Sequence, residues 1–398
     1  MPDSSFTETE RNSQRLFRKL ANYCERFSRS YASGMSPAMI RLRALWFQIH
    51  KWLGISLAIL VIPASLTGAA LVWHDWIDRQ LYPERYPVAG SADLPPSAYA
   101  AGALKLAQPG EYISTLAFPQ ESGAVQATLT KQPTGGGRPS RAIVWLDPKS
   151  AQPIERGGPR DGALGLLHVI HGTFMLGPIG RQIVGWIGIA MLLSSLTGIW
   201  LWWPLKGRFA RGLRWGRRPD FNSNLHHTGG FWIALPLAVL SATGVWISFP
   251  AVFNPPIGAQ PGPSQPLATP AQSPDEALAA AHLVMPGEAA SIGWPTDKRA
   301  DWTISIKGDG KPVEISVKDS DASASVAPAK PETFARTMRR IHDGTGMGAV
   351  WQVIIFLGGI LPAALAVTGI LMWLRMRRRR GKHRRSAAAF AEAEALAN

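Results

Sequence analysis

Histidine is the residue type in this sequence that could bind a metal within an apolar environment. Seven of the nine histidines lie near the ends of four long apolar runs: His50, His74, His168, His171, His226, His227 and His342. No Asp, Glu, Lys or Arg lies inside these runs, which argues against a proton- or ion-coupled transporter. The sequence also lacks the motifs of nucleotide binding and of hydrolysis. A site in the apolar part of the chain must therefore use histidine as a cofactor ligand, and we assign no catalytic residue.

The elements that must position these histidines are the apolar runs themselves. They cover residues 52–73, 182–205, 231–249 and 350–374. Each is about the length that a helix needs to cross roughly 30 Å of hydrocarbon. Interior prolines, which would break soluble helices, are tolerated in bundles of spanning helices. The pattern predicts a membrane protein with a bundle of four transmembrane helices.

The charge distribution predicts how these helices are oriented. The chain has 398 residues and a net charge of +15, but only 17% of its residues are charged, against about 25% in soluble domains. Lys and Arg concentrate in three blocks, with nine in 1–51, six in 206–218 and eight in 375–385. Basic segments stay on the cytoplasmic side of a bilayer. We therefore expect both termini in the cytoplasm, the intervening segments outside, membrane lipid as a partner, and no nucleic acid.

An internal duplication is indicated by two marks that recur along the chain. The first mark is a His followed four residues later by Gly, and the second is a Thr-Gly pair further on. The marks occur four times: His50 and Gly54 with Thr67-Gly68, His168 and Gly172 with Thr197-Gly198, His226 and Gly230 with Thr243-Gly244, and His342 and Gly346 with Thr368-Gly369. This recurrence predicts two copies of a helix, an external segment and a second helix.

Each external segment has the pattern of a small α+β module. The sequence Ser273-Pro-Asp-Glu276 is a capping box that predicts a helix through about Val284. The residues that follow alternate between apolar and polar, with a hairpin over Asp309-Gly310. In the first segment, a helix near Ala98–Ala107 precedes three short strands. The Pro-rich stretch between helix three and the second module predicts an extended linker.

The predicted organisation follows the chain in ten parts. They are a basic cytoplasmic segment (1–44), transmembrane helix 1 (45–74), periplasmic module 1 (75–164), an interface helix with transmembrane helix 2 (165–205), a basic loop (206–222), transmembrane helix 3 (223–249), a Pro-rich linker (250–272), periplasmic module 2 (273–335), transmembrane helix 4 (336–375) and a basic tail (376–398).

Haem b fits the histidine pattern better than a metal cluster does. The single cysteine, Cys24, excludes an iron–sulfur cluster and covalent haem attachment. Two imidazoles from facing helices can bind one iron from both sides, and Gly four residues after a His removes the side chain beside the ring. His168 and His171 share one helix face, so at most one of them is the ligand. His226 is preferred over His227, because it aligns with His50.

The motifs resemble the PepSY-associated transmembrane family of bacterial inner-membrane proteins over about residues 45–380. The resemblance rests on four segments: HKWLGISLAILVIPASLTGAAL, LHVIHGTFMLGPIGRQIVGWIGIAMLLSSLTGIWLWWP, LHHTGGFWIALPLAVLSATGVWISFP and RIHDGTGMG with LAVTGILMWLRMRRR. It implies four spanning helices, two external PepSY modules and, for some members, two b-type haems in a ferrisiderophore reductase. The family's ligands carry over to His50, His171, His226 and His342.

The sequence is compatible with two functions. The first is a di-haem reductase that passes electrons from a cytoplasmic reductase or membrane quinol to a ferric siderophore in the periplasm. The second is a non-enzymatic membrane protein whose modules bind or regulate a peptidase or another envelope partner. For the first, we predict one haem between His50 and His226 and one between His171 and His342. His168 or His74 could substitute at the second site.

Overall fold

The computed structural model describes most of the chain outside its N-terminal segment. The described residues are 37–86, 92–119, 123–133, 139–158, 161–203, 213–216, 220–253, 264–267, 269–308, 312–328 and 331–397. Most of the basic segment, most of the basic loop, part of the Pro-rich linker and the Asp309-Gly310 turn lie outside these residues. The chain forms two compact units. The first comprises Met1–Leu57, Leu193–Ala234 and Thr368–Asn398, and the second comprises Ala58–Leu192 and Leu235–Val367.

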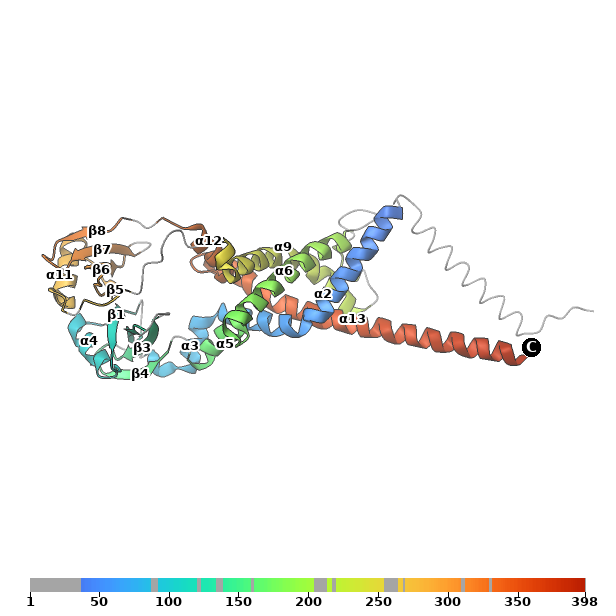
Figure 1. Cartoon of the computed structure of the whole chain (residues 1–398), viewed down its shortest axis with the longest axis horizontal. Coiled ribbons are helices and arrows are strands. Elements are labelled where there is room, and N and C mark those ends of the chain that lie inside the picture. The colour runs from blue at the N-terminus through green and yellow to red at the C-terminus, as the bar shows by residue number, and fades with distance from the viewer. Residues whose placement is uncertain are drawn as a thin grey trace, which may run out of the picture. The chain divides into compact units, whose positions relative to one another are not determined.

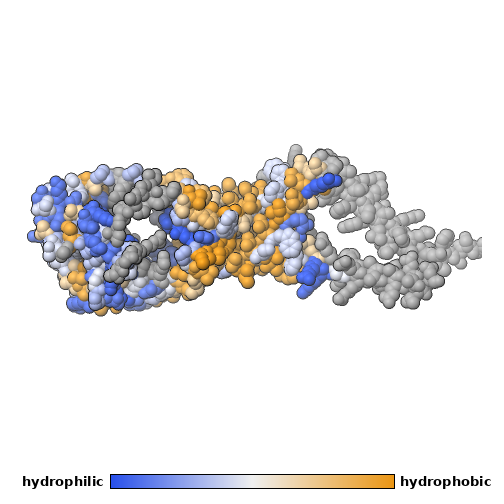
Figure 2. Space-filling view, viewed as in Figure 1, coloured by the Kyte–Doolittle hydropathy of each residue, from blue (hydrophilic) through white to orange (hydrophobic). Residues whose placement is uncertain are grey.

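Four helices are long and apolar enough to cross a membrane. Their candidate spans are Ala38–Leu71 in α2 (Pro37–Leu71), Gly177–Trp202 in α6 (Gly177–Trp202), Phe221–Ser248 ending in α9 (Gly230–Ser248), and Gly348–Arg379 in α13 (Gly348–Ala397). Large apolar side chains such as Ile59, Leu235 and Val350 are 71–78% exposed on these helices. Figure 2 shows hydrophobic residues covering the surface of the spanning helices. A surface of this kind suits lipid rather than water.

Two short helices precede spanning helices and carry histidines. Helix α5 (Gly162–Thr173) ends at Phe174, a left-handed residue, and α6 begins at Gly177. The break between the two helices therefore lies at residues 174–176. Helix α12 (Phe334–Asp343) ends before α13 begins at Gly348, so the predicted fourth helix is two helices. Gly344, Gly346 and Gly348 all have positive φ in the turn between them, which favours glycine at these positions.

Eight strands form one antiparallel sheet in the order β4-β3-β2-β1-β5-β6-β7-β8 (Figure 1). The strands are β1 (Glu111–Ala117), β2 (Val125–Lys131), β3 (Ser140–Leu146), β4 (Pro153–Gly157), β5 (Ala289–Gly293), β6 (Asp301–Ile306), β7 (Val313–Lys318) and β8 (Ala324–Val326). The two expected modules are thus joined edge to edge by β1 and β5, with Leu116 opposite Ile292. The sequence pattern does not predict this pairing.

The core of the sheet follows from the alternation of its strands. In β6 and β7, Trp302, Ile304, Ile315 and Val317 are buried, while the residues between them are not. Trp302 is opposite Val317 and Ile304 is opposite Ile315. The buried side chains of the two strands therefore lie on the same face of the sheet. Helix α4 (Pro96–Leu104) packs on β1, β2 and β3, and helix α11 (Pro274–Val284) packs on β5 to β8. The two helices also contact each other. The capping box at the start of α11 is confirmed.

Candidate functional site: two histidine pairs

The structure brings four histidines together in two pairs. The ring centroids of His50 and His226 lie 6.2 Å apart with an interplanar angle of 85°. Those of His171 and His342 lie 6.1 Å apart at 37°. The first pair belongs to the first unit and the second pair to the second unit. These are the two pairs expected from the sequence.

His50 lies on α2 and contacts α6. Its Nδ1 is 3.1 Å from Thr197 Oγ1 and 3.4 Å from Ser194 Oγ. The Thr197 hydroxyl donates to the helix carbonyls of Leu193 at 2.8 Å and Ser194 at 3.1 Å. A hydroxyl has one proton and two lone pairs. Since that proton points to the helix backbone, Thr197 accepts a hydrogen bond from the His50 Nδ1–H, and Nε2 keeps its lone pair.

His226 lies in a π-helical turn, η2 (Leu225–Gly229), that joins the short helix α8 (Phe221–Asn224) to α9. Turns of this type are rare and are common at functional sites. The Asp220 side chain caps α8 by accepting from the Ser223 amide and binds Arg375 of α13 at 3.1 Å. His226 Nδ1 is 3.2 Å from Thr368 Oγ1, also on α13. Helix α13 therefore holds both the start of this segment and the His226 ring.

His171 lies in the last turn of α5 and contacts α2. Its Nδ1 is 2.8 Å from the carbonyl oxygen of Ala64. A carbonyl only accepts hydrogen bonds, so Nδ1 carries the proton. Burial lowers the pKa of His171. The ring is therefore neutral at pH 7, with the Nε2 lone pair available to a metal.

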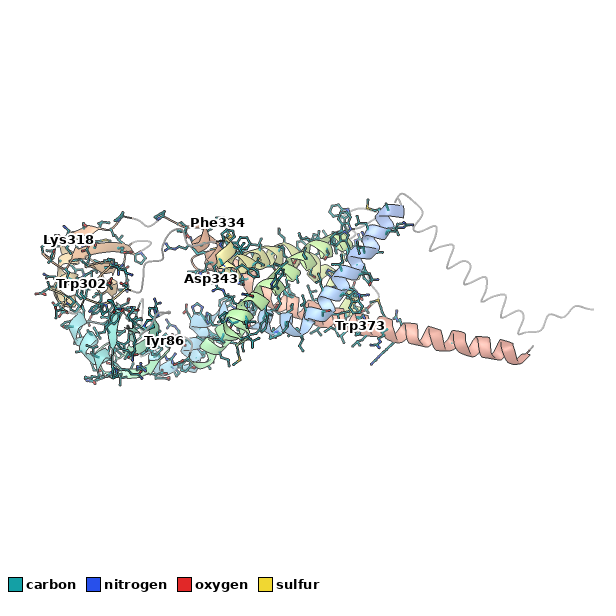
Figure 3. The ribbon with its side chains drawn as sticks, in the orientation of Figure 1. Tyr86, Trp302, Lys318, Phe334, Asp343 and Trp373 are labelled. Carbon is teal, nitrogen blue, oxygen red and sulfur yellow. The ribbon has the colours of Figure 1, made fainter. Side chains whose placement is uncertain are left out.

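His342 lies in the last turn of α12 and contacts α9. Its Nδ1 is 3.1 Å from both the Leu240 carbonyl and Thr243 Oγ1. Burial, and then the nearby His171, lower the pKa of His342 to about 4. Figure 3 labels Phe334 and Asp343 at the two ends of this helix. His342 is thus a neutral ring fixed by the helix on which Thr243 lies.

The Thr-Gly pairs explain how the rings approach so closely. A Cβ built on Gly68 would lie 2.6 Å from His171 Cε1, and one on Gly244 would lie 3.1 Å from His342 Cε1. On Gly198 and Gly369 the corresponding distances to His50 and His226 are 3.4 Å. Each of the four histidine rings therefore packs against the glycine of one Thr-Gly pair. In the sequence, these pairs are recognisable only as part of a repeat.

The glycines that lie four residues after a histidine were expected to leave space beside the histidine ring on a shared helix face, and this does not hold for all of them. A Cβ on Gly54 or Gly172 would meet nothing within 4 Å, so space is open there. Gly346, however, lies in the turn after α12 and shares no helix face with His342, because α12 ends at Asp343. The inference of a common helix face is wrong at that position.

The other candidate histidines lie outside the two pairs. His168 is exposed and its Nδ1 lies 3.0 Å from its own helix carbonyl at Leu164. His74 begins helix α3 (His74–Leu81), where Nδ1 lies 3.1 Å from the Leu71 carbonyl and Nε2 lies 3.1 Å from Asp75. The His227 ring lies 6.3 Å from that of His226. His168 and His74 thus contact residues of their own helix or of the turn just before it.

The spacing within both pairs fits one iron atom held by two imidazoles. A metal–imidazole bond is about 2.0 Å and the ring centre lies about 1.2 Å beyond the nitrogen, so two axial rings have centres roughly 6.3 Å apart. The observed separations are 6.2 and 6.1 Å. Among the described residues, no group of three or more His, Cys, Asp or Glu could hold a metal ion. Two nitrogen donors without further protein ligands suit a haem better than a protein-only metal site.

The family model described as the PepSY-associated TM region matches residues 47–376. The chain belongs to this PepSY-associated transmembrane family. A search of curated proteins finds no match. All four paired histidines and all four Thr-Gly pairs lie within the matched range. The family match also agrees with the four apolar helices, so this is a multi-pass membrane protein of the PepSY type.

Proposed function

We propose that this PepSY-associated membrane protein binds two b-type haems and reduces ferric siderophores. In this proposal it lies in the bacterial inner membrane with both termini in the cytoplasm. Electrons enter at the His50–His226 site and leave at the His171–His342 site, and Fe(II) is released in the periplasm for uptake.

The observation that carries the proposal is the spacing of the two ring pairs. Their centroid separations of 6.2 and 6.1 Å match the roughly 6.3 Å expected for two imidazoles that would share one iron. Open space at Gly54 provides room beside His50 for a flat macrocycle. Haem b held by these histidines would supply one-electron transfer.

The residues of the chain position the donors and keep them neutral. At the His171–His342 pair, burial lowers both pKa values, so neither ring carries a charge that would repel a metal. At His50, Thr197 fixes the proton on Nδ1 and leaves Nε2 as the ligand atom. A ring in a fixed tautomer and orientation binds metal more strongly than a free one.

The choice of a ferric siderophore follows from what one electron can do. Hard oxygen chelators bind Fe(III) far more tightly than Fe(II), so a single electron converts a tightly held ion into a loosely held one. The sequence lacks a flavin or nicotinamide motif. The donor is therefore a separate cytoplasmic reductase or a quinol, which can give one electron to each of two ferric chelates.

The first test is the absorption spectrum of the purified protein. We expect reducible b-type bands with two haems per chain. The dithionite-reduced protein should then be reoxidised by a ferric hydroxamate without oxygen, as Fe(II) appears in a ferrozine trap. A folded protein without haem would refute the proposal. If haem is present and every ferric chelate fails to reoxidise it, the reductase assignment is refuted and a partner-binding role becomes the better hypothesis.

A further inference from the structure

We propose that Thr197, Thr243 and Thr368 are positioning residues that tune the haem iron through the histidine that each contacts. The inference rests on the proposed function, because it requires a haem at each pair. It concerns the threonine hydroxyls and not the histidines themselves.

The contact geometry is shared by three sites on three helices. The hydroxyl oxygens of Thr197, Thr368 and Thr243 lie 3.1, 3.2 and 3.1 Å from the Nδ1 atoms of His50, His226 and His342. All three threonines are 4–5% exposed. Hydroxyls so deeply buried need hydrogen-bond partners, and here the ring nitrogen is one of them.

The direction of two of these hydrogen bonds follows from the helix backbone. Thr243 donates to the Val239 carbonyl at 2.9 Å and to the Leu240 carbonyl at 3.0 Å, as Thr197 does on its own helix. With its proton shared between these carbonyls, each hydroxyl offers the ring only a lone pair. The ring must then donate through Nδ1–H.

A donating Nδ1–H makes the opposite nitrogen a stronger electron donor to a metal. Stronger axial donation favours Fe(III) over Fe(II), so it lowers the reduction potential of the iron. Removal of the acceptor hydroxyl should therefore raise the potential of that haem and weaken its binding.

The fourth threonine is a matched control that the chain itself supplies. Thr67 belongs to the same kind of Thr-Gly pair and is 8% exposed. Its hydroxyl donates to the carbonyls of Pro63 at 2.6 Å and Ala64 at 3.1 Å, while His171 donates directly to that same Ala64 carbonyl. Loss of the Thr67 hydroxyl thus leaves the acceptor of the histidine in place.

The experiment measures each haem separately in the full chain. In a His342→Ala background, which should retain only the His50–His226 haem, Thr197→Val is compared with the background alone. We expect a higher midpoint potential and about 10-fold or greater loss of haem affinity. Thr197→Ser should restore both values, because serine keeps the hydroxyl. Thr67→Val in a His50→Ala background should leave the potential of the remaining haem unchanged.

The outcomes separate this inference from the function on which it rests. If the wild-type protein binds no haem, the proposed function fails and the inference fails with it. If both haems bind but Thr197→Val shifts the potential no more than Thr67→Val does, only the inference is refuted. Should Thr197→Val not fold, Thr368→Val in the His342→Ala background tests the same haem through His226. We expect a higher potential there as well, and an unchanged potential would refute the inference. Thr243 is not used for this comparison, because the Leu240 carbonyl also lies 3.1 Å from the Nδ1 of His342.

Discussion

The His50–His226 pair and the His171–His342 pair use the same residue types but hold their rings differently. In the first pair, the rings are nearly perpendicular, at 85°, and each lies 3.4 Å from the Cβ position of a helix glycine. In the second pair, the angle is 37° and the corresponding distances are 2.6 and 3.1 Å. The same motif, a histidine ring packed against the glycine of a Thr-Gly pair, therefore gives looser packing in the first pair and tighter packing in the second.

The difference follows from the helices that carry the ligands. His50 lies within the long helix α2, and His226 lies in the π turn that leads into α9. His171 and His342 instead lie at the ends of the short helices α5 and α12, each followed by a left-handed residue. A short helix that ends at its ligand can dock closer to its neighbour. Because the spacing is equal while the packing differs, the separation of the rings is the feature that the two sites share.

The largest expected effect comes from the ligands themselves. His50→Ala or His226→Ala should remove one haem, and His171→Ala or His342→Ala should remove the other, because each change leaves an iron with one protein ligand. Haem content per folded chain, from a pyridine haemochrome assay, measures this. His168→Ala and His74→Ala serve as controls and should retain two haems. If single variants lose both haems or neither, the pairing is wrong.

The next effect tests the difference in packing. Gly68→Ala should displace His171, since the new Cβ would lie 2.6 Å from its ring, whereas Gly198→Ala meets the His50 ring at 3.4 Å. A contact below 3 Å requires movement, and both rings are held by hydrogen bonds. We expect Gly68→Ala to lose most of the haem at the His171–His342 pair, and Gly198→Ala to keep both. Equal haem loss in the two variants would contradict the contrast between the sites.

A spectroscopic difference should accompany the two ring angles. Perpendicular imidazole planes leave the iron d orbitals nearly degenerate, while rings closer to parallel split them. The ferric protein should therefore give two low-spin electron paramagnetic resonance signals, a highly anisotropic one from the His50–His226 pair and a rhombic one from the His171–His342 pair. The His342→Ala variant should retain only the anisotropic signal. Retention of the rhombic signal in that variant would reverse the assignment.

The sequence predicts the spanning helices and the ligand candidates because both depend on local patterns. Apolar length identifies a spanning helix, and the capping box at Ser273 identifies the start of α11. The pairing of β1 with β5 could not be found in this way, since it depends on contacts between segments far apart in the chain. The π turn at His226 has no sequence signature either. The Thr-Gly pairs are visible in the sequence as a repeated motif. Only the packing of Gly68 against His171 shows that the glycine makes room for a histidine ring.

The smallest expected effect concerns two arginines that bind the ends of the helices opposite the ligands. Arg43 donates to the carbonyls of Trp200, at 3.4 Å, and Leu201 at the end of α6, the helix of Thr197. Arg181 donates to the carbonyl of Ile247 at the end of α9, the helix of Thr243. A cation at a helix C-terminus contributes about 0.3–1 kcal/mol.

Replacement of either arginine should therefore loosen one site slightly and leave the other as it was. Arg43→Gln should lower the temperature at which the His50–His226 haem is lost by a few degrees, because α6 would fray near Thr197. Arg181→Gln should do the same for the His171–His342 haem, because α9 would fray beyond Thr243. The two losses can be followed separately in the His342→Ala and His50→Ala backgrounds by absorbance during heating. If each arginine variant destabilised both haems equally, the helix ends would act on the bundle as a whole, and the two sites could not be treated as independent.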